Sequence, residues 1–403
     1  MVKSKCRICK GKLYTVLDLG ELYISDFLTG SQEGEKSPIS LGECKKCGLI
    51  QLEYNYNLDS LYKEHYWYRS GLNKSMLSDL KNIVDDVESK VELNDNDLVI
   101  DIGCNDGSLF NFYSNQNIIK VGYDPAPNIE RLATESCSLF INNYYSRANL
   151  DAKVITSIAM FYDLPDPNKF VNDIMLDLHD DGIWIIQFTD LMSMLKVNAI
   201  DNICAEHLEY YKLADIVRLL KRHNLQAIDV SYNKVNGGSI RITVAHKGRY
   251  KVDKSVGKAL KAEINYLRYN SIPFLYAKTD MYRKFIRNYI KKFNSVYGMA
   301  ASTKGNTLLQ LLKLDNGDIL AIGEVNKDKF GLRTAGTNIP IMPEKEVLKA
   351  KPDLIIVLAW HFRETFDKVL EDYIEQGGRV LYPLPVPTII SNKGEFILDG
   401  NRD

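Results

Sequence analysis

The chain has 403 residues, 45% of them hydrophobic and 26% charged, a composition typical of a globular protein with a real core and roughly two or three domains. Its 51 Lys and Arg nearly balance 52 Asp and Glu, so no basic excess favours nucleic acid or an anionic membrane as a partner. The longest apolar stretches are strand-sized and no apolar run follows the first lysines, which predicts a cytoplasmic protein without a membrane span or secretory signal.

Two C-x-x-C pairs mark the first segment, residues 1–72, which we expect to be a zinc-binding domain. The pairs are Cys6 with Cys9 and Cys44 with Cys47. Four thiolates can close a tetrahedral shell around Zn²⁺ and leave no position for water, so the site would be structural. Basic residues beside the pairs, including Arg7, would offset the thiolate charge. Four unrelated free cysteines or a redox pair are the alternatives, and neither pair follows the strand that a redox motif requires.

The second segment, residues 73–248, alternates strands and helices in the rhythm of a parallel doubly wound sheet. Strands are predicted at 98–102, 118–124, 152–160 and 182–188. Such sheets bind ligands at the carboxyl ends of their strands, near the switch point. The residues at those ends are Asp101, Gly103, Asn105, Asp106, Gly107, Asp124, Pro125, Ala159, Met160, Phe161 and Gln187. We expect these residues to bind the cofactor.

The glycine turn DIGCNDG, residues 101–107, indicates which cofactor binds. The dinucleotide fingerprint needs a glycine where Asn105 stands, because the backbone must approach a pyrophosphate there. A ligand without a pyrophosphate tolerates Asn105. Asp124 can accept hydrogen bonds from both ribose hydroxyls of an adenosine, and Asp101 can meet an ammonium group. These features favour S-adenosylmethionine over a nicotinamide cofactor or a purely structural turn.

The stretch AEHLEYY, residues 205–211, concentrates side chains suited to proton transfer. His207 is neutral near pH 7 and can accept a proton, and Glu206 can orient its ring. The structural alternative is that His207 caps a helix beginning near Leu213. The residues Asn236, Gly237, Gly238 and Ser239 form either a hairpin turn or a set of backbone donors to the substrate.

The third segment, residues 249–403, is predicted to be a second, shorter α/β unit. An amphipathic helical region at about 252–295 precedes strands at 318–326, 353–360 and 378–385. Lys304 and Asn306 stand ahead of an apolar helix, where they can bind a diphosphate; the alternative is helix capping by Asn306 or Thr307. His361 follows a strand and is a further candidate for substrate binding.

Seven motifs then occur in a specific order along the chain. They are the double C-x-x-C, YRSGLNKSM (68–76), DIGCNDG (101–107), CAEHLEYY (204–211), VNGGSIRI (235–242), AASTKGNTLL (300–309) and TAGTNIPI (334–341). This set resembles the three-domain sugar C-methyltransferases, which add the C-3 branch to nucleotide-linked 4-keto-deoxysugars. The resemblance implies a zinc-binding domain, a central Rossmann-like class I methyltransferase domain and a C-terminal Rossmann-like α/β domain that helps to bind the nucleotide sugar.

The resemblance also implies residue roles. It makes His207 the base, beside Glu206, and places Tyr68 at the active site, where its hydroxyl could stabilise an enolate oxygen. Family members have a tyrosine where this chain has Cys204, a departure that concerns the substrate more than the reaction. The partner is therefore expected to be a small molecule, a nucleotide-linked keto sugar, with no nucleic acid or membrane; the sequence does not indicate an oligomeric state.

Three other functions remain as alternatives. The first is a methyltransferase of the same fold acting on another sugar-derived or small-molecule substrate. The second is a nucleotide-sugar epimerase or dehydrogenase that uses the C-terminal unit, although AIGEVNKD offers only one glycine after its strand. The third is a zinc-knuckle module for nucleic acid, against which the near-neutral charge argues.

Overall fold

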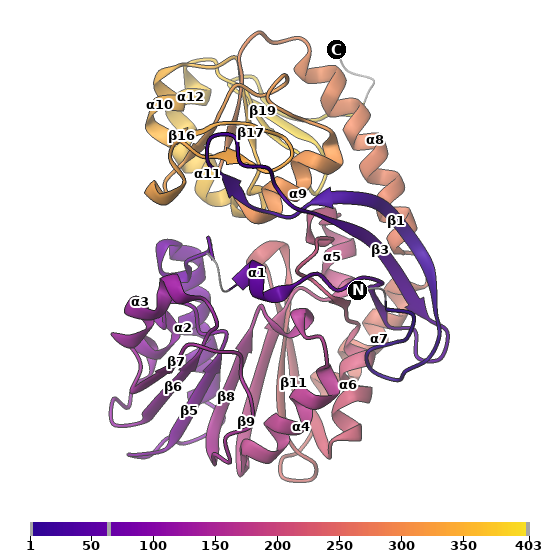
Figure 1. Cartoon of the computed structure of the whole chain (residues 1–403), viewed down its shortest axis with the longest axis vertical. Helices are drawn as coiled ribbons and strands as arrows, with labels where there is room; N and C mark the ends of the chain where they lie inside the picture. The colour runs from indigo at the N-terminus through magenta and orange to yellow at the C-terminus, as the bar shows by residue number, and fades with distance from the viewer. Residues whose placement is uncertain (1–2, 63–65, 400–403) are drawn as a thin grey trace. The chain divides into compact units, whose positions relative to one another are not determined.

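The computed structural model describes residues 3–62 and 66–399 of the chain. The chain forms two compact units. Unit 1 comprises Met1–Tyr14, Gly42–Ser193 and Glu206–Arg268, and unit 2 comprises Thr15–Leu41, Met194–Ala205 and Tyr269–Asp403. Each unit contains a largely parallel sheet accompanied by helices (Figure 1), which confirms the predicted α/β class.

In the described part of unit 1, seven strands form a sheet in the order β11-β12-β9-β8-β5-β6-β7. The strands are β5 (Leu98–Ile102), β6 (Ile119–Tyr123), β7 (Leu139–Ile141), β8 (Ala152–Ile158), β9 (Leu178–Phe188), β11 (Leu225–Asn233) and β12 (Ser239–His246). The five neighbouring strands β9, β8, β5, β6 and β7 pair in parallel, whereas β12 is antiparallel to β9 and β11. The strand order reverses between β5 and β8, so ligands are expected at the carboxyl ends of these strands.

The alternation of side chains along β9 shows how this sheet is covered. Trp184 and Ile186 belong to one hydrophobic cluster, and Ile183 and Ile185 belong to another. The first cluster includes α4 (Pro167–Asp177), α6 (Leu213–Arg222) and α7 (Lys254–Leu267), and the second includes α2 (Lys74–Glu88). Both faces are therefore buried, which explains the nearly continuous apolar runs that predicted these strands.

The N-terminal strands adjoin the two C-x-x-C pairs: one follows the first pair, one leads into the second pair and one follows it. They are β1 (Leu13–Tyr23), β3 (Lys36–Cys44) and β4 (Ile50–Leu52). Within unit 1, β4 pairs in antiparallel with β10 (Glu209–Tyr210), and Glu209 lies opposite Gln51. Part of the AEHLEYY stretch is thus a strand paired with the N-terminal region.

Unit 2 contains, among its described residues, a sheet in the order β16-β14-β13-β17-β18-β19-β20. The strands are β13 (Val296–Met299), β14 (Ile322–Glu324), β16 (Ile341–Pro343), β17 (Leu354–Val357), β18 (Val380–Tyr382), β19 (Thr388–Ser391) and β20 (Gly394–Ile397). The first five are parallel, and β19 and β20 add an antiparallel edge. The three strands predicted in this segment correspond to β14, β17 and β18.

Helices complete unit 2. They are α8 (Ile272–Ile290), α9 (Thr303–Leu312), α10 (Glu344–Lys349), α11 (Arg363–Val369) and α12 (Glu371–Glu375). Short elements elsewhere are α1 (Leu58–Tyr62), α3 (Glu130–Thr134), α5 (Leu191–Lys196), β2 (Phe27–Leu28) and β15 (Arg333–Thr334). The predicted helical region at about 252–295 corresponds to α7 and α8.

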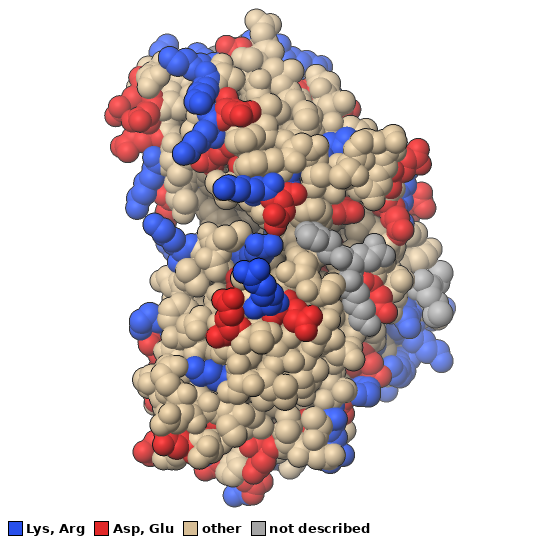
Figure 2. All heavy atoms as spheres, turned by 60° about the vertical axis from the view of Figure 1, so that its left-hand side comes forward, with Lys and Arg blue, Asp and Glu red and all other residues tan. Residues whose placement is uncertain are grey.

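Two surface properties accompany this fold. None of the helices in the described ranges combines the length and the apolar character that crossing a membrane requires. On the face shown in Figure 2, acidic and basic side chains of the described residues occur in small interspersed groups among other side chains.

Candidate active site

The four cysteines of the two C-x-x-C pairs form one cluster in unit 1. Their sulfur atoms all lie within 4.8 Å of one another. Cys6 Sγ is 3.5 Å from Cys47 Sγ, and Cys9 Sγ is 3.4 Å from Cys44 Sγ. Zinc–sulfur bonds of about 2.3 Å in a tetrahedron place the sulfurs about 3.8 Å apart, so the cluster fits Zn²⁺. Gly11 leaves the necessary space, because a Cβ there would lie 2.8 Å from Cys44 Sγ.

The glycine turn brings bare backbone to the carboxyl end of β5. Gly103, Asn105 and Gly107 have φ values of 72°, 51° and 72°, a conformation that Gly and Asn adopt most readily. A Cβ on Gly103 would lie 3.2 Å from Cγ of Met160. The turn therefore forms a cradle that a larger side chain would fill, as a site for a nucleoside ligand requires.

Asp101 and Asp124 lie at the ends of β5 and β6 beside this cradle. Asp124 accepts hydrogen bonds from the backbone N–H groups of Asn105 and Ala126, both at 3.0 Å. Asp101 accepts one from the Thr156 hydroxyl at 2.6 Å. Burial raises the pKa of Asp124 to about 6 and, together with the charge of Asp124, raises the pKa of Asp101 to about 7. Two buried carboxyls suit a cationic ligand, and S-adenosylmethionine carries an ammonium and a sulfonium group.

Side chains of the turn hold the YRSG stretch against it. Asn105 Nδ2 donates to the carbonyl of Tyr68 at 3.0 Å, and its Oδ1 accepts the N–H of Ser70 at 2.9 Å. Asp106 accepts the N–H of Gly71 at 2.7 Å. Tyr68 therefore lies at the cofactor edge of the sheet, where burial raises its pKa and keeps its phenol protonated. The side chains of Asn105 and Asp106 serve this contact, which the sequence did not predict.

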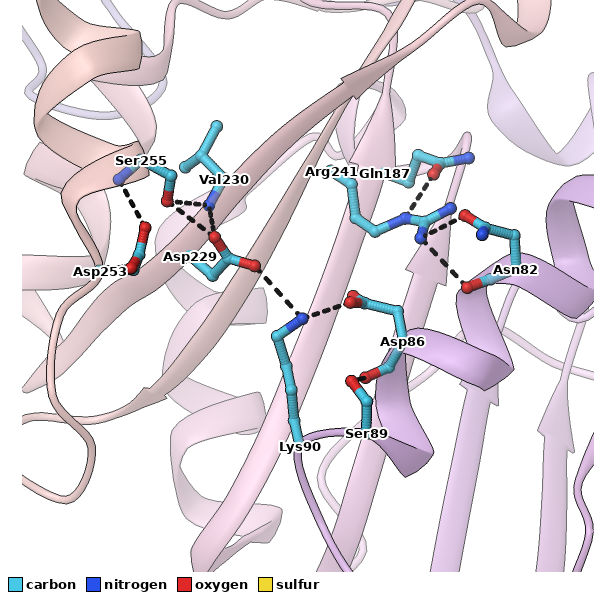
Figure 3. Close-up of polar contacts among 10 residues, drawn as sticks. All are labelled: Asn82, Asp86, Ser89, Lys90, Gln187, Asp229, Val230, Arg241, Asp253 and Ser255. Carbon is cyan, nitrogen blue, oxygen red and sulfur yellow. Dashed lines mark hydrogen bonds and ion pairs between the residues drawn. The ribbon is translucent and has the colours of Figure 1, made fainter.

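Gln187 belongs to a buried polar network with Arg241 (Figure 3). Arg241 Nε donates to Gln187 Oε1 at 2.8 Å, and the same guanidinium donates to Asn82 Oδ1 at 3.0 Å. It also lies 3.2 Å from Asp79. Gln187 Nε2 donates to Asp79 at 2.6 Å, and its backbone carbonyl accepts the N–H of Ala159 at 2.7 Å. The Gln187 side chain thus ties the end of β9 to α2 and β12, while its backbone carbonyl binds the residue that follows β8.

Phe161 and Pro125 differ in their surroundings. The ring of Phe161 is fully buried in an aromatic cluster, with centroids 5.6 Å from Trp184 and 5.3 Å from Tyr211. Pro125 follows Asp124 directly and is partly exposed. The Phe161 ring therefore anchors the loop after β8 in the hydrophobic core.

The AEHLEYY stretch lies at the same edge of the unit 1 sheet. The Leu208 N–H donates to the carbonyl of Tyr162 at 2.8 Å, and the rings of His207 and Tyr162 are 4.2 Å apart. Tyr162 belongs to the 3-10 turn Phe161–Asp163 that follows β8. The N-cap of α6 is Lys212, which excludes the alternative that His207 caps this helix. Glu206 and His207 are both partly exposed.

Acidic and tyrosine side chains surround this stretch. The Tyr62 hydroxyl donates to Asp163 at 3.0 Å. Burial raises the pKa of Asp163 well above its usual range, and the carboxyls of Glu206 and Glu209 raise it further. Burial and the charge of Asp163 likewise raise the pKa of Tyr66. Asp163 is therefore a functional candidate that sequence reasoning missed, although it stands at a carboxyl strand end.

The residues Asn236 to Ser239 join β11 to β12. Ser239 is paired with Asn233, and Ile240 is paired with Phe188 at the carboxyl end of β9. Asn236 and Gly238 have φ values of 56° and 121°. These residues thus form a hairpin turn, while their role as backbone donors to the substrate stays a prediction. The turn stands at the edge that also carries the glycine turn.

A second group of predicted residues comes together in unit 2. Burial lowers the pKa of Lys304, and the nearby groups Asp201 and Cys204 oppose this shift. The ring of His361 is partly exposed; desolvation lowers its pKa, and the charge of Lys304 lowers it further. The buried carboxyl of Asp201 accepts the indole N–H of Trp360 at 2.8 Å. Asp201 was not predicted, because nothing in its local sequence distinguishes it from a surface acid.

Capping does not explain Asn306 or Thr307. The N-cap of α9 is Ser302, whose hydroxyl accepts the N–H of Gly305 at 2.9 Å. Asn306 instead donates to the carbonyl of Asp26 at 3.0 Å, and the hydroxyl of Thr307 lies 3.2 Å from that of Ser25. Asn306 therefore contacts the segment that precedes β2.

Three family models match the chain in succession. They are a zinc binding domain at residues 6–62, a methyltransferase domain at 75–230 and a C-methyltransferase C-terminal domain at 234–385. The chain is also 26% identical to the C-methyltransferase NovU of Streptomyces niveus over 408 residues, which covers 96% of this chain and 97% of that relative.

Solved structures are similar to less than half of the chain. A chain of the complex between the Trm112 methyltransferase activator of Haloferax volcanii and a methyltransferase is 13% identical, with a TM-score of 0.36, and covers 44% of this chain and 94% of that chain. The magnesium protoporphyrin IX methyltransferase of Synechocystis PCC 6803, solved with bound S-adenosylmethionine, is 11% identical, with a TM-score of 0.34 and coverage of 42% and 79%.

The assignment rests on the three models and the full-length relative. The models follow one another in the order of the predicted segments, and the cysteine cluster lies within the match to the zinc binding domain. By these matches the chain combines a zinc binding domain, a methyltransferase domain and a C-methyltransferase C-terminal domain, and it is an S-adenosylmethionine-dependent methyltransferase that is similar to a C-methyltransferase over nearly its whole length.

Proposed function

We propose that this methyltransferase adds a methyl branch to the carbon next to the ketone of a nucleotide-linked keto sugar, with His207 as the base. The position of His207 is the observation that carries the proposal. Its ring is 4.2 Å from that of Tyr162, and the next residue, Leu208, is hydrogen bonded to the Tyr162 carbonyl at 2.8 Å. Tyr162 lies in the 3-10 turn after β8, so His207 stands near the strand ends at which the cofactor is expected.

Methylation of carbon requires a carbanion, which a ketone provides as an enolate. S-adenosylmethionine, when bound, supplies an electrophilic methyl group. His207 would remove the α-proton with a ring nitrogen, a step that typically accelerates a reaction by about 10²- to 10⁴-fold. Glu206 would stabilise the imidazolium, and the Tyr68 phenol would donate a hydrogen bond to the developing enolate oxygen. Binding would also hold the nucleophilic carbon of the substrate in line with the methyl group of the cofactor. The entropic cost of bringing them together would then be met before the reaction.

The remaining predicted residues keep their proposed roles. The cofactor would be bound by Asp101, Gly103, Asn105, Asp106, Gly107, Asp124, Pro125, Ala159, Met160, Phe161 and Gln187, of which Phe161 and Gln187 would act by support rather than by side-chain contact. The substrate would be bound by Tyr68, Asn236, Gly237, Gly238, Ser239, Lys304, Asn306 and His361. Domain boundaries after residues 72 and 248 and a cytoplasmic location also stay predictions.

Exchange of the substrate α-proton with deuterated solvent tests the base directly. The enzyme is incubated with S-adenosylhomocysteine and a nucleotide-linked 4-keto-deoxyhexose, so that proton removal is measured without methyl transfer. His207→Asn should cut this exchange by about two orders of magnitude and leave cofactor affinity within twofold. His179→Asn, which alters a histidine at the start of β9, is the matched control and should exchange normally.

Two results would contradict the proposal. Normal exchange in the His207 variant would place the base elsewhere. A product that carries its methyl group on oxygen or nitrogen, detected by carbon-13 NMR, would exclude the enolate route.

A further inference from the structure

Arg7 stands between two metal ligands but its side chain points to the active-site stretch. It lies in the first C-x-x-C pair, between Cys6 and Cys9. Its Nε is 3.3 Å from Oε1 of Glu209, and the two side chains are 2% and 0% exposed. The same guanidinium donates to the carbonyl of Leu208 at 3.2 Å. Arg7 therefore contacts the two residues that directly follow His207.

The guanidinium also ties this stretch to the strand beside it. Arg7 Nη1 donates to the carbonyl of Leu52 at 2.9 Å, and Nη2 contacts Asn55 Oδ1. The backbone N–H of Arg7 donates to Gln51 Oε1 at 2.8 Å. Gln51 is itself the pairing partner of Glu209 in the β4–β10 ladder. The Arg7 side chain thus contacts both strands of the β4–β10 ladder.

Other side chains fasten the knuckles to the helices of unit 1. Asn168 on α4 donates to the carbonyls of Arg7 and Ile8, both at 3.0 Å. On α6, Arg222 donates to the carbonyl of Ile8 at 2.6 Å, and Arg218 donates to that of Cys47 at 2.8 Å. These contacts dock the knuckles on α4 and α6 and do not involve residues 206–211. They separate docking from the contact that Arg7 makes.

We propose that Arg7 is a positioning residue for the proposed base, and that metal binding at the first knuckle sets the place of His207 through it. Coordination of Cys6 and Cys9 fixes the backbone of Arg7, and the Arg7–Glu209 pair passes that position to the stretch that carries His207. The chemical demand is specific, because the planar guanidinium serves several acceptors at once, which the single ammonium of lysine cannot do. Arg7 was predicted to offset the charge of the thiolates, and its guanidinium is paired with the buried carboxyl of Glu209.

The proposal rests on His207 being the base, so its test has one arm that does not involve chemistry. Arg7→Met retains the bulk of the side chain and removes its donors. In the full-length, zinc-loaded protein with S-adenosylhomocysteine bound, backbone amides of residues 206–211 should exchange with deuterium at least tenfold faster, measured by mass spectrometry. Zinc should stay at one per chain. Substrate α-proton exchange, measured with a nucleotide-linked 4-keto-deoxyhexose, should fall at least tenfold, and Arg7→Lys should recover part of both losses.

Arg222→Met is the matched control, because it removes a guanidinium that donates to the carbonyl of Ile8, next to Arg7, and makes no hydrogen bond or ion pair with residues 206–211 in the part of the chain that the structure describes. Both kinds of exchange should stay within twofold of the unaltered protein. If Arg7→Met fails to fold because Glu209 is left buried and unpaired, the double variant Arg7→Met/Glu209→Leu removes both charges and is measured in its place. In that variant too, faster amide exchange in 206–211 and slower α-proton exchange support the proposal.

Unchanged amide exchange in residues 206–211 would overturn the proposal, and so would normal α-proton exchange in a variant whose amides exchange faster. Failure of the underlying function is distinguishable. In that case His207→Asn would itself exchange the α-proton normally, while the amide measurement would still report whether Arg7 positions the stretch.

Discussion

Asp101 and Asp124 show how burial adjusts single residues at the cofactor edge. Burial raises their pKa values to about 7 and about 6, while the Thr156 hydroxyl opposes the shift at Asp101 and two backbone N–H groups oppose it at Asp124. A protonated carboxyl cannot form an ion pair with the ammonium group proposed for Asp101, and it is a weaker acceptor for the ribose hydroxyls proposed for Asp124, so we expect the cofactor to bind the ionised forms. Both carboxyls are therefore mostly ionised, as the proposed cofactor contacts require, only above these raised pKa values.

Cofactor affinity is accordingly expected to depend on pH with a definite sign. Below about pH 6 both carboxyls hold protons that binding must release, so affinity for S-adenosylmethionine should fall as pH decreases from 8 to 5.5. The fall should approach tenfold per pH unit for each proton released. Calorimetry in buffers of different ionisation enthalpy measures both the affinity and the protons released. Asp124→Asn should weaken binding at pH 8 and flatten the profile; a profile as steep as that of the unaltered protein would contradict the role of Asp124.

The glycine turn acts at the scale of an element, because it holds the cofactor edge and the YRSG stretch together. Asn105 combines a left-handed backbone with two side-chain hydrogen bonds to residues 68–70. Glycine at this place would keep the backbone relaxed and lose only the hydrogen bonds. Alanine would lose the bonds and add backbone strain of about 1–2 kcal/mol.

The pair of substitutions separates these two contributions. Asn105→Gly should lower the free energy of unfolding by about 1–3 kcal/mol for two net hydrogen bonds, and Asn105→Ala should lower it by about 1–2 kcal/mol more. Urea unfolding gives these values, and deuterium exchange of residues 66–72 should become faster in both variants. Equal exchange in all three proteins would show that Asn105 does not hold the YRSG stretch.

At the scale of the whole molecule, the zinc cluster joins segments that are far apart in the chain. Its knuckles contribute Ile8 and Leu49 to the hydrophobic cluster that also contains Trp184 of β9 and Leu213 of α6. A structural zinc site typically supplies about 10–16 kcal/mol of binding free energy to the folded form, so removing it affects this shared core.

Cys44→Ser is expected to abolish the zinc site and destabilise the fold. Elemental analysis should find well below one zinc per chain, and the thermal midpoint should fall by about 10 °C or more, since several kcal/mol are lost in a unit of this size. Cys137→Ser, outside the cluster, is the control and should keep its zinc. A Cys44→Ser protein with one zinc per chain would mean that the four cysteines do not form the metal site.

The sequence predicted those features that are encoded in local patterns. Continuous apolar runs gave β5, β6, β8 and β9, because strands buried on both faces need apolar residues at every position. The strands β13 and β16 were not predicted; in β16, Pro340 and Pro343 flank the two apolar residues Ile341 and Met342, a pattern more typical of a loop than of a strand. The spacing of the cysteines likewise identified the metal cluster, since each pair is a local knuckle.

The tertiary structure alone decided which polar groups meet and which are buried. No local pattern pairs Arg7 with Glu209, joins Asn105 to Tyr68, or places Asp163 and Asp201 in buried surroundings. A hydrogen bond or an ion pair depends on which distant backbone comes near, and a pKa depends on how much water the fold removes. The sequence by itself determined the elements, the metal ligands and the resemblance to C-methyltransferases; the packing of distant segments determined how the residues around His207 are held, because long-range polar contacts leave no periodic trace in the chain.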